Sequence, residues 1–225
     1  TNTPSISLAS TNVSCNGFLD GTASILSTGG GGGGGISILT YCSSFPFFDD
    51  KNNIELVRLV GDGDSIVNNT SNLADQYEDY TPQFTTLSPS LTYDLDIILG
   101  VYNNSTNSVW EAGAKAFIDW NIDGDFDDVG EEIGIILTDT TSIPNLNTLT
   151  FTVPNLGIYG ATRLRVVSQY NNDSFGPCEV AAAPTYTPYY GATEDYSIII
   201  KEPTTLDTYL WSSGDITSEI TNLIA

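Results

Sequence analysis

The chain has 225 residues, of which 28 are Asp or Glu and six are Lys or Arg, so its formal net charge at pH 7 is −22. This charge argues against nucleic acid as a partner, and no apolar run approaches the roughly 20 residues that cross a bilayer, so we expect no membrane insertion. The sequence has no histidine, which excludes Ser-His-Asp triads and imidazole metal sites, and we expect that the protein is not an enzyme.

The first 40 residues fall into two parts. Residues 1–28 have the composition of strands and turns but are too few to form a core of their own. Seven consecutive glycines at 29–35 follow and indicate a linker over residues 29–40, because such a run cannot hold ordered side-chain packing.

Short runs of alternating apolar residues, bounded by Gly, Asn, Asp and Pro, fill residues 41–202. These runs are residues 54–60, 91–101, 114–120, 133–137, 149–153, 162–168 and 196–200. Seven such runs predict an all-β fold, namely a β-sandwich.

The run at 162–168 carries two of the six basic residues. Leu164 and Val166 share one face, and Arg163, Arg165 and Val167 share the other, so we expect one face in the core and one in water. The arginines either pair with acidic residues on neighbouring strands or bind an acidic ligand, and we favour the pairing.

The strongest chemical pattern is an acidic loop at residues 119–132 with seven carboxylates in fourteen positions. Oxygen ligands on alternate residues, with Gly124 at the sixth place, are what a short loop needs to wrap Ca²⁺. Candidate ligands are Asp119, Asn121, Asp123 and Asp125, closed by Asp127, Asp128 or Glu131. The loop differs from an EF-hand because Gly130 stands at the twelfth place and a strand precedes it. We expect structural Ca²⁺; the alternative is an acidic hairpin tip solvated by water.

Several separated motifs connect the sandwich to a known family. They are Tyr41-Cys42, Tyr77-Glu78-Asp79-Tyr80-Thr81, Phe117-Ile118-Asp119-Trp120-Asn121, Thr162-Arg163-Leu164-Arg165, Pro177-Cys178 and Gly191-Ala192-Thr193-Glu194-Asp195-Tyr196. In order and spacing they resemble the GEVED domain of secreted bacterial proteins over residues 41–201. The last motif departs from Gly-Glu-Val-Glu-Asp-Tyr by the loss of one acidic residue.

This resemblance implies a β-sandwich within large surface or secreted proteins and a disulfide between Cys42 and Cys178. Cys15 is then the odd cysteine, either a small buried hydrophobe or a partner in an intermolecular disulfide. We expect Glu194 and Asp195 to anchor the last strand, one of them reaching a metal or the arginine pair.

The two flanks carry a second resemblance. Residues 11–25 and 208–223 are similar to the first half and the continuation of the SprB-type repeat of gliding-motility adhesins. This implies a second small immunoglobulin-like β unit formed by residues 1–28 and 203–225, with the sandwich inserted in it. The family has a further strand after the position of Ala225. We expect either that residues 3–9 of a neighbouring subunit donate it or that Ala225 is only the end of a fragment.

These features predict a structural or adhesive module of an extracellular cell-surface protein or filament, exported by the type IX route and partnered by copies of itself or by neighbouring domains. The alternative is a glycan- or ligand-binding module, for which Trp110, Tyr186, Tyr189 and Tyr190 offer ring faces. In proteins exported by that route, Asp-Ser or Asp-Thr followed by an apolar residue or Thr accepts O-linked glycans, and Ser65 and Thr140 fit this pattern.

Overall fold

The computed structural model describes residues 5–11, 22–28, 39–48, 52–70, 75–100, 102–103, 108–109, 112–138, 146–170 and 174–203. The chain divides into two compact units, Thr1–Leu39 and Thr40–Ala225. In the first unit, β1 (Ser5–Thr11) pairs antiparallel with β2 (Thr22–Thr28). Cys15, the glycine run and residues 204–225 lie outside the described residues, as do Trp110 and Thr140. No helix long and apolar enough to cross a membrane occurs in the described part of the chain.

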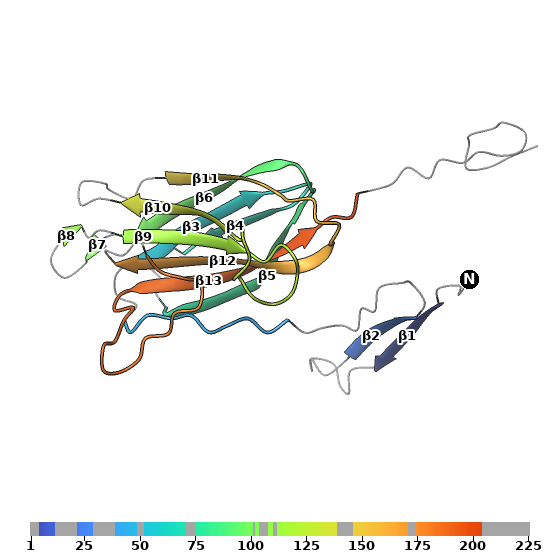
Figure 1. Cartoon of the computed structure of the whole chain (residues 1–225), viewed down its shortest axis with the longest axis horizontal. Coiled ribbons are helices and arrows are strands. Elements are labelled where there is room, and N and C mark those ends of the chain that lie inside the picture. Colours follow the sequence, from blue (N-terminus) through green and yellow to red (C-terminus); the bar gives the residue numbers. More distant parts are fainter. Residues whose placement is uncertain are drawn as a thin grey trace, which may run out of the picture. The chain divides into compact units, whose positions relative to one another are not determined.

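The second unit is an all-β sandwich of two sheets, as predicted (Figure 1). The five-stranded sheet has the order β10 (Glu132–Thr138), β9 (Ala112–Ile118), β12 (Gly160–Tyr170), β13 (Gly191–Ile200), β5 (Tyr77–Leu87). The four-stranded sheet has the order β11 (Leu146–Thr152), β6 (Thr92–Gly100), β3 (Asn53–Val60), β4 (Ser65–Asn69). A short pair, β7 (Tyr102–Asn103) and β8 (Ser108–Val109), follows β6. Neighbours within these sheets are antiparallel except β13 and β5, which run parallel.

The core lies between the two sheets and is built from the inward-facing residues of each strand. Leu59 and Ile97 from the four-stranded sheet belong to the same buried cluster as Ile118, Leu164 and Ile198 from the five-stranded sheet. Each such side chain contributes about 1.5–3 kcal/mol by leaving water.

Two strands of the main sheets, β5 and β4, were not predicted from the sequence, and both have weak local signals. β5 contains Pro82, which lacks the N–H that a central strand needs, but β5 is an edge strand and pairs only with β13 in its sheet. The register also shifts, since Asp195 faces Asp79 while Ser197 faces Phe84. β4 has only five residues and ends in two asparagines, which are uncommon in strands.

The expectation that one face of residues 162–168 lies in water was wrong. Arg165 and Val167 are 1% and 2% exposed, almost as buried as Leu164 on the other face. Val167 packs with Phe117, Phe126 and Phe175 in a second apolar cluster, which Tyr41 and Cys42 partly cover. The outer face of the five-stranded sheet is therefore covered by the segment before β3 and by the loops that follow β9 and β12.

Candidate metal-binding loop

The acidic loop connects β9 to β10 and is held at its start by the carboxylate of Asp119. This residue is fully buried. Its Oδ1 accepts the N–H of Asp123 at 3.3 Å, and its Oδ2 accepts the N–H of Gly124 at 3.0 Å and the hydroxyl of Tyr41 at 2.7 Å. Both oxygens of Asp119 therefore fix the course of the loop backbone.

Glu131 holds the other end of the loop in the same way. It is 1% exposed, and its two oxygens accept the N–H groups of Trp120 and Asp128 at 3.0 and 3.2 Å. Burial raises the pKa of its carboxyl, and the neighbouring carboxylates of Asp119 and Asp128 add to this rise, while the two N–H donors oppose it. Asp119 and Glu131 thus act as two clamps that close the loop.

The loop backbone adopts conformations that few residues tolerate. Gly124 has a φ of 98°, as predicted for the turn glycine. Ile122 has a φ of 58°, which is unusual for a β-branched residue and costs about 1–3 kcal/mol. Its side chain packs against the main core, and the two clamps hold the backbone on either side.

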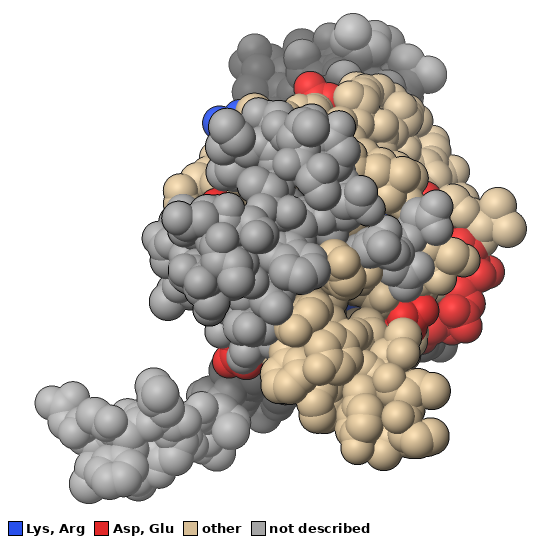
Figure 2. Space-filling model, turned by 90° about the vertical axis from the view of Figure 1, so that its left-hand side faces the viewer, with Lys and Arg blue, Asp and Glu red and all other residues tan. Residues whose placement is uncertain are grey.

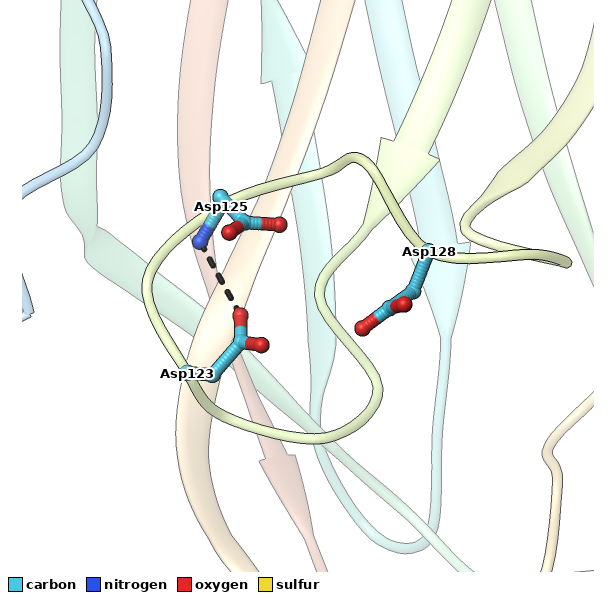
Figure 3. Close-up of side chains that lie close together, drawn as sticks. All are labelled: Asp123, Asp125 and Asp128. Atoms are coloured by element: carbon cyan, nitrogen blue, oxygen red, sulfur yellow. Dashed lines mark hydrogen bonds between the residues drawn. The ribbon is translucent and has the colours of Figure 1, made fainter.

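Three carboxylates converge inside the loop. Oxygens of Asp123, Asp125 and Asp128 lie within 4.8 Å of one another, and all three residues are exposed. Figure 3 shows their side chains pointing into the space that the loop encloses, with the N–H of Asp125 donating to Oδ1 of Asp123 at 3.2 Å. We call these three residues the acidic trio.

The amide of Asn121 lies against this trio. Its Nδ2 donates to Oδ2 of Asp123 at 2.9 Å and to Oδ2 of Asp128 at 2.6 Å. Its Oδ1 is buried and has no hydrogen-bond partner. The amide nitrogen of Asn121 therefore bridges two carboxylates, as a cation would, and the amide oxygen beside them is an acceptor without a partner.

The structure thus divides the seven predicted ligands into three groups. Asn121 and the acidic trio come together at one point, whereas Asp119 and Glu131 serve the backbone. Asp127 is exposed and is not a member of the trio. A pocket of about 480 Å³ adjoins the loop and is lined partly by Asn121 and Asp128.

A buried ion pair stands on the outer face of the five-stranded sheet, where Arg165 of β12 faces Asp195 of β13. Arg165 donates from Nε to Oδ1 of Asp195 at 2.7 Å and from Nη2 to Oδ2 at 2.8 Å. Oδ2 also accepts from Nη1 of Arg163 at 3.1 Å and from the hydroxyl of Tyr77 at 2.9 Å. The favoured interpretation of the arginines, cross-strand pairing, is correct, but the pair is buried and not on the surface.

Arg165 also donates hydrogen bonds to the backbone at the predicted disulfide. Cys42 and Cys178 are bonded, as the family resemblance implied. Nη1 of Arg165 donates to the carbonyls of Cys42 and Pro177 at 2.8 and 2.9 Å. One guanidinium therefore connects the last strand to both arms of the disulfide.

Comparison with known families agrees with this part of the structure. Residues 113–199 match the model of the GEVED domain family. The match runs from β9 to β13 and includes the acidic loop, the two arginines and Asp195, but it is shorter than the predicted 41–201 and leaves out Cys42. No curated protein matches the chain.

The GEVED match also contains a further buried carboxyl, Glu194, which points into the core on the opposite side of β13 from Asp195. Its Oε2 accepts the hydroxyl of Tyr196, which in turn accepts Nδ2 of Asn68 at 2.8 Å. Its Oε1 is buried without a partner. Burial raises the pKa of Glu194 to about 8, and the carboxyl of Glu78 on the adjacent strand adds to the rise.

The predicted aromatic loop of the GEVED match forms a surface that extends beyond its own residues. Tyr186 and Tyr189 are exposed, whereas Tyr190 is partly buried. Phe47 and Phe48, from the segment before β3, join them, with ring centroids of Phe47 and Tyr186 at 4.5 Å and of Phe48 and Tyr189 at 5.1 Å. The phenylalanines were missed because they lie about 140 positions earlier in the sequence.

The glycosylation candidate Ser65 is exposed at the start of β4. The carboxylate of the preceding Asp64 accepts the N–H of Thr86 and the hydroxyl of Thr85, so it is held against β5.

Proposed function

We propose that this chain is a structural or adhesive module of an extracellular bacterial surface protein or filament, stiffened by a calcium ion and by the Cys42–Cys178 disulfide. The observation that carries the proposal is the convergence of the acidic trio inside a loop whose two ends are clamped. Each pair of charges at that separation repels by about 1 kcal/mol even in water. A loop of this shape is therefore strained without a cation and rigid with one.

Calcium suits the donors that the loop offers. The trio and Asn121 present hard oxygen ligands, and Ca²⁺ accepts six to eight such oxygens at about 2.3–2.6 Å in flexible geometry. Ligands on opposite sides of the ion would then be about 5 Å apart, which accommodates the spacing within the trio. The ion would neutralise the trio and replace the bridging amide nitrogen of Asn121. Figure 2 shows the largest group of acidic side chains gathered at one edge of the face drawn, with Lys or Arg visible at one spot.

Thermal unfolding with and without a chelator tests the calcium proposal. Free Ca²⁺ at about 100 times its dissociation constant would stabilise the fold by about 2.7 kcal/mol, or about 5–10 °C in Tm for a chain of this size. Asp123→Asn should abolish most of this shift, whereas Asp127→Asn, in the same loop but outside the trio, should retain it. An identical Tm in excess chelator and in Ca²⁺ would refute the proposal.

An extracellular location is supported by the disulfide, because such bonds persist in oxidising compartments. We further propose that the protein is exported by the type IX route and O-glycosylated at Ser65 and Thr140. Intact-mass measurement of the protein from its native source should show sugar additions that disappear in Ser65→Ala or Thr140→Ala, and a native mass equal to that of the unmodified chain would contradict the modification.

Self-assembly is the partner interaction that we propose, and β1 and β2 support it. Within the described residues their sheet has two strands, and an isolated two-stranded sheet is marginally stable in water. A strand from a neighbouring subunit, residues 3–9 in our proposal, would complete the small unit by strand donation. Because these residues overlap β1, the donated strand would exchange its pairing with β2 of its own chain for pairing with the neighbour. Electron microscopy of the native protein should show regular filaments that are lost when residues 3–9 are deleted; dispersed monomers at all concentrations would contradict the assembly.

Glycan binding is a second candidate function, favoured by the exposed aromatic surface of Phe47, Phe48, Tyr186 and Tyr189. Exposed rings stack on the apolar faces of sugars. Without a ligand, clustered exposed rings favour association of the protein with other proteins. A glycan array with the native chain and with Tyr189→Ala would test this function, which predicts binding that the variant loses.

A further inference from the structure

A pocket of about 310 Å³ lies beside the buried ion pair and is distinct in its lining from the pocket at the acidic loop. Its polar lining consists of Tyr41, Ser43, Ser44, Tyr77, Arg163 and Arg165. Two of the six basic residues of the chain therefore line one pocket, and no carboxylate of the described residues lines it. The volume is at the lower end of small-molecule sites, which span about 300–1,000 Å³.

The two guanidinium groups differ in how many donors they have left. Each has five N–H donors. Arg165 uses four, two on Asp195 and two on the carbonyls of Cys42 and Pro177. Arg163, whose side chain is 25% exposed, uses one in the described part of the chain, on Asp195. The remaining donors of Arg163 are the principal cationic hydrogen-bonding capacity of the pocket.

Arg163 is also held in place before any ligand arrives. Its guanidinium lies over the ring of Tyr41 at 4.4 Å from the centroid, and the hydroxyl of Tyr41 donates to Asp119. Hydrogen bonds from Thr81 lower the pKa of Asp79, and the charge of Arg163 adds to this, but the carboxylate of Asp79 does not line the pocket. A preorganised guanidinium with free donors is suited to a carboxylate, which it binds through two parallel hydrogen bonds.

The other lining groups suit a sugar ring. Ser43 is exposed and offers a hydroxyl, and Tyr77 is 36% exposed while its own hydroxyl is fixed on Asp195. A sugar acid can contact all three kinds of group, because its ring stacks on the aromatic face, its hydroxyls bond the serine hydroxyl and its carboxylate binds the guanidinium. A polyanion is disfavoured, because the net charge of −22 repels it over about one Debye length of 8 Å at physiological salt.

We propose that this pocket binds the carboxylate of a single hexuronic acid residue, with Arg163 as the carboxylate-binding residue, Ser43 donating to a ring hydroxyl and Tyr77 packing against the ring. This site shares no residue with the acidic trio or Asn121. It also differs from the aromatic surface of the second candidate function, which contains no arginine.

Calorimetric titration of the oxidised full chain with glucuronate, glucose and acetate tests the proposal. Glucuronate should bind with a dissociation constant of about 1 mM, as expected for a ligand of its size at ordinary efficiency per atom. Glucose, with the same ring and no charge, and acetate, with the charge and no ring, should each bind at least about tenfold more weakly. If glucose binds as tightly as glucuronate, Arg163 does not bind the carboxylate. If acetate binds as tightly as glucuronate, the pocket does not recognise the sugar ring.

Variants locate the binding in the pocket. Arg163→Gln should lower the affinity for glucuronate by about ten- to a hundredfold. Arg163→Lys keeps the charge but loses the planar fork, so its affinity should lie between those of the native chain and Arg163→Gln. Arg58→Gln is the matched control, because Arg58 pairs with Asp96 on the other sheet and should leave binding unchanged. Should Arg163→Gln fail to fold, Ser43→Trp on the exposed rim provides the second test by filling the entrance. Unchanged affinity in a folded Arg163→Gln or in Ser43→Trp refutes the proposal.

Discussion

The buried pair of Arg165 and Asp195 should be the most sensitive polar contact of the sandwich. The side chains of both residues are at most 2% exposed, and the carboxylate accepts four hydrogen bonds from three side chains. Asp195→Asn keeps the shape of the side chain but leaves the guanidinium of Arg165 buried without its counter-charge. Breaking a buried ion pair from one side costs about 3–5 kcal/mol.

The chain offers its own control for this substitution. Arg58 and Asp96 form the same kind of pair at 2.5 Å, but the side chain of Arg58 is 44% exposed. Water screens this pair, so Asp96→Asn should cost only about 0–1 kcal/mol. The comparison separates the effect of burial from the effect of losing an Asp–Arg contact.

Equilibrium urea unfolding at pH 7 with the disulfide intact is the measurement. A loss of 3–5 kcal/mol is readily resolved against a total stability of about 5–15 kcal/mol. If Asp195→Asn costs no more than Asp96→Asn, the ion pair does not anchor β13 to the disulfide.

The remaining predictions concern pH and the disulfide. The pKa of Glu194 is raised from 4.5 to about 8 in the folded chain, so the folded state binds a proton that the unfolded state releases between these values. The stability that this group contributes is therefore full below pH 4.5 and is lost as pH rises to about 8, by at most about 1.4 kcal/mol per pH unit; Glu194→Gln should flatten this slope in urea unfolding measured from pH 5 to 9, and an unchanged slope would assign it to other groups. Cys42→Ser with Cys178→Ser opens a loop of 136 residues and should lower the unfolding free energy by up to about 5 kcal/mol, whereas a loss below about 1 kcal/mol would show that the bond does not constrain the unfolded chain.

Much of the fold was accessible from the sequence because most strands alternate over a single core. Each of the seven predicted runs overlaps a strand of the two main sheets, although the runs at 91–101, 114–120 and 149–153 extend past the ends of their strands. β5 was not predicted because it contains Pro82, which an edge strand tolerates. Its position at the edge follows only from its pairing with β13. Alternation alone cannot reveal such a role, since it depends on which strands become neighbours.

The candidate site was predicted in composition but not in arrangement. The ligand pattern included the acidic trio, Asn121 and the two clamps, but it could not separate the clamps from the trio. That division depends on burial, because Asp119 and Glu131 sit where the loop leaves the sheet and their oxygens find backbone N–H groups there. The burial of Arg165 was missed for a related reason, since the loops that cover it come from distant parts of the chain.

The motif at residues 191–196 shows how one short segment can serve two faces of a sheet. Glu194 points into the core and Asp195 points to the outer face, because neighbours on a strand alternate. Gly191 is required by a close approach, since a Cβ there would meet the carbonyl oxygen of Ser168. Ala192 stands where the naming motif of the GEVED family has Glu, and here it is 1% exposed in the main core on the same side as Glu194. A carboxylate at this position would place a second acid beside Glu194 in the core. The loss of that acid therefore leaves Glu194 as the one buried carboxyl that the motif contributes to the core, while Asp195 retains its full set of partners.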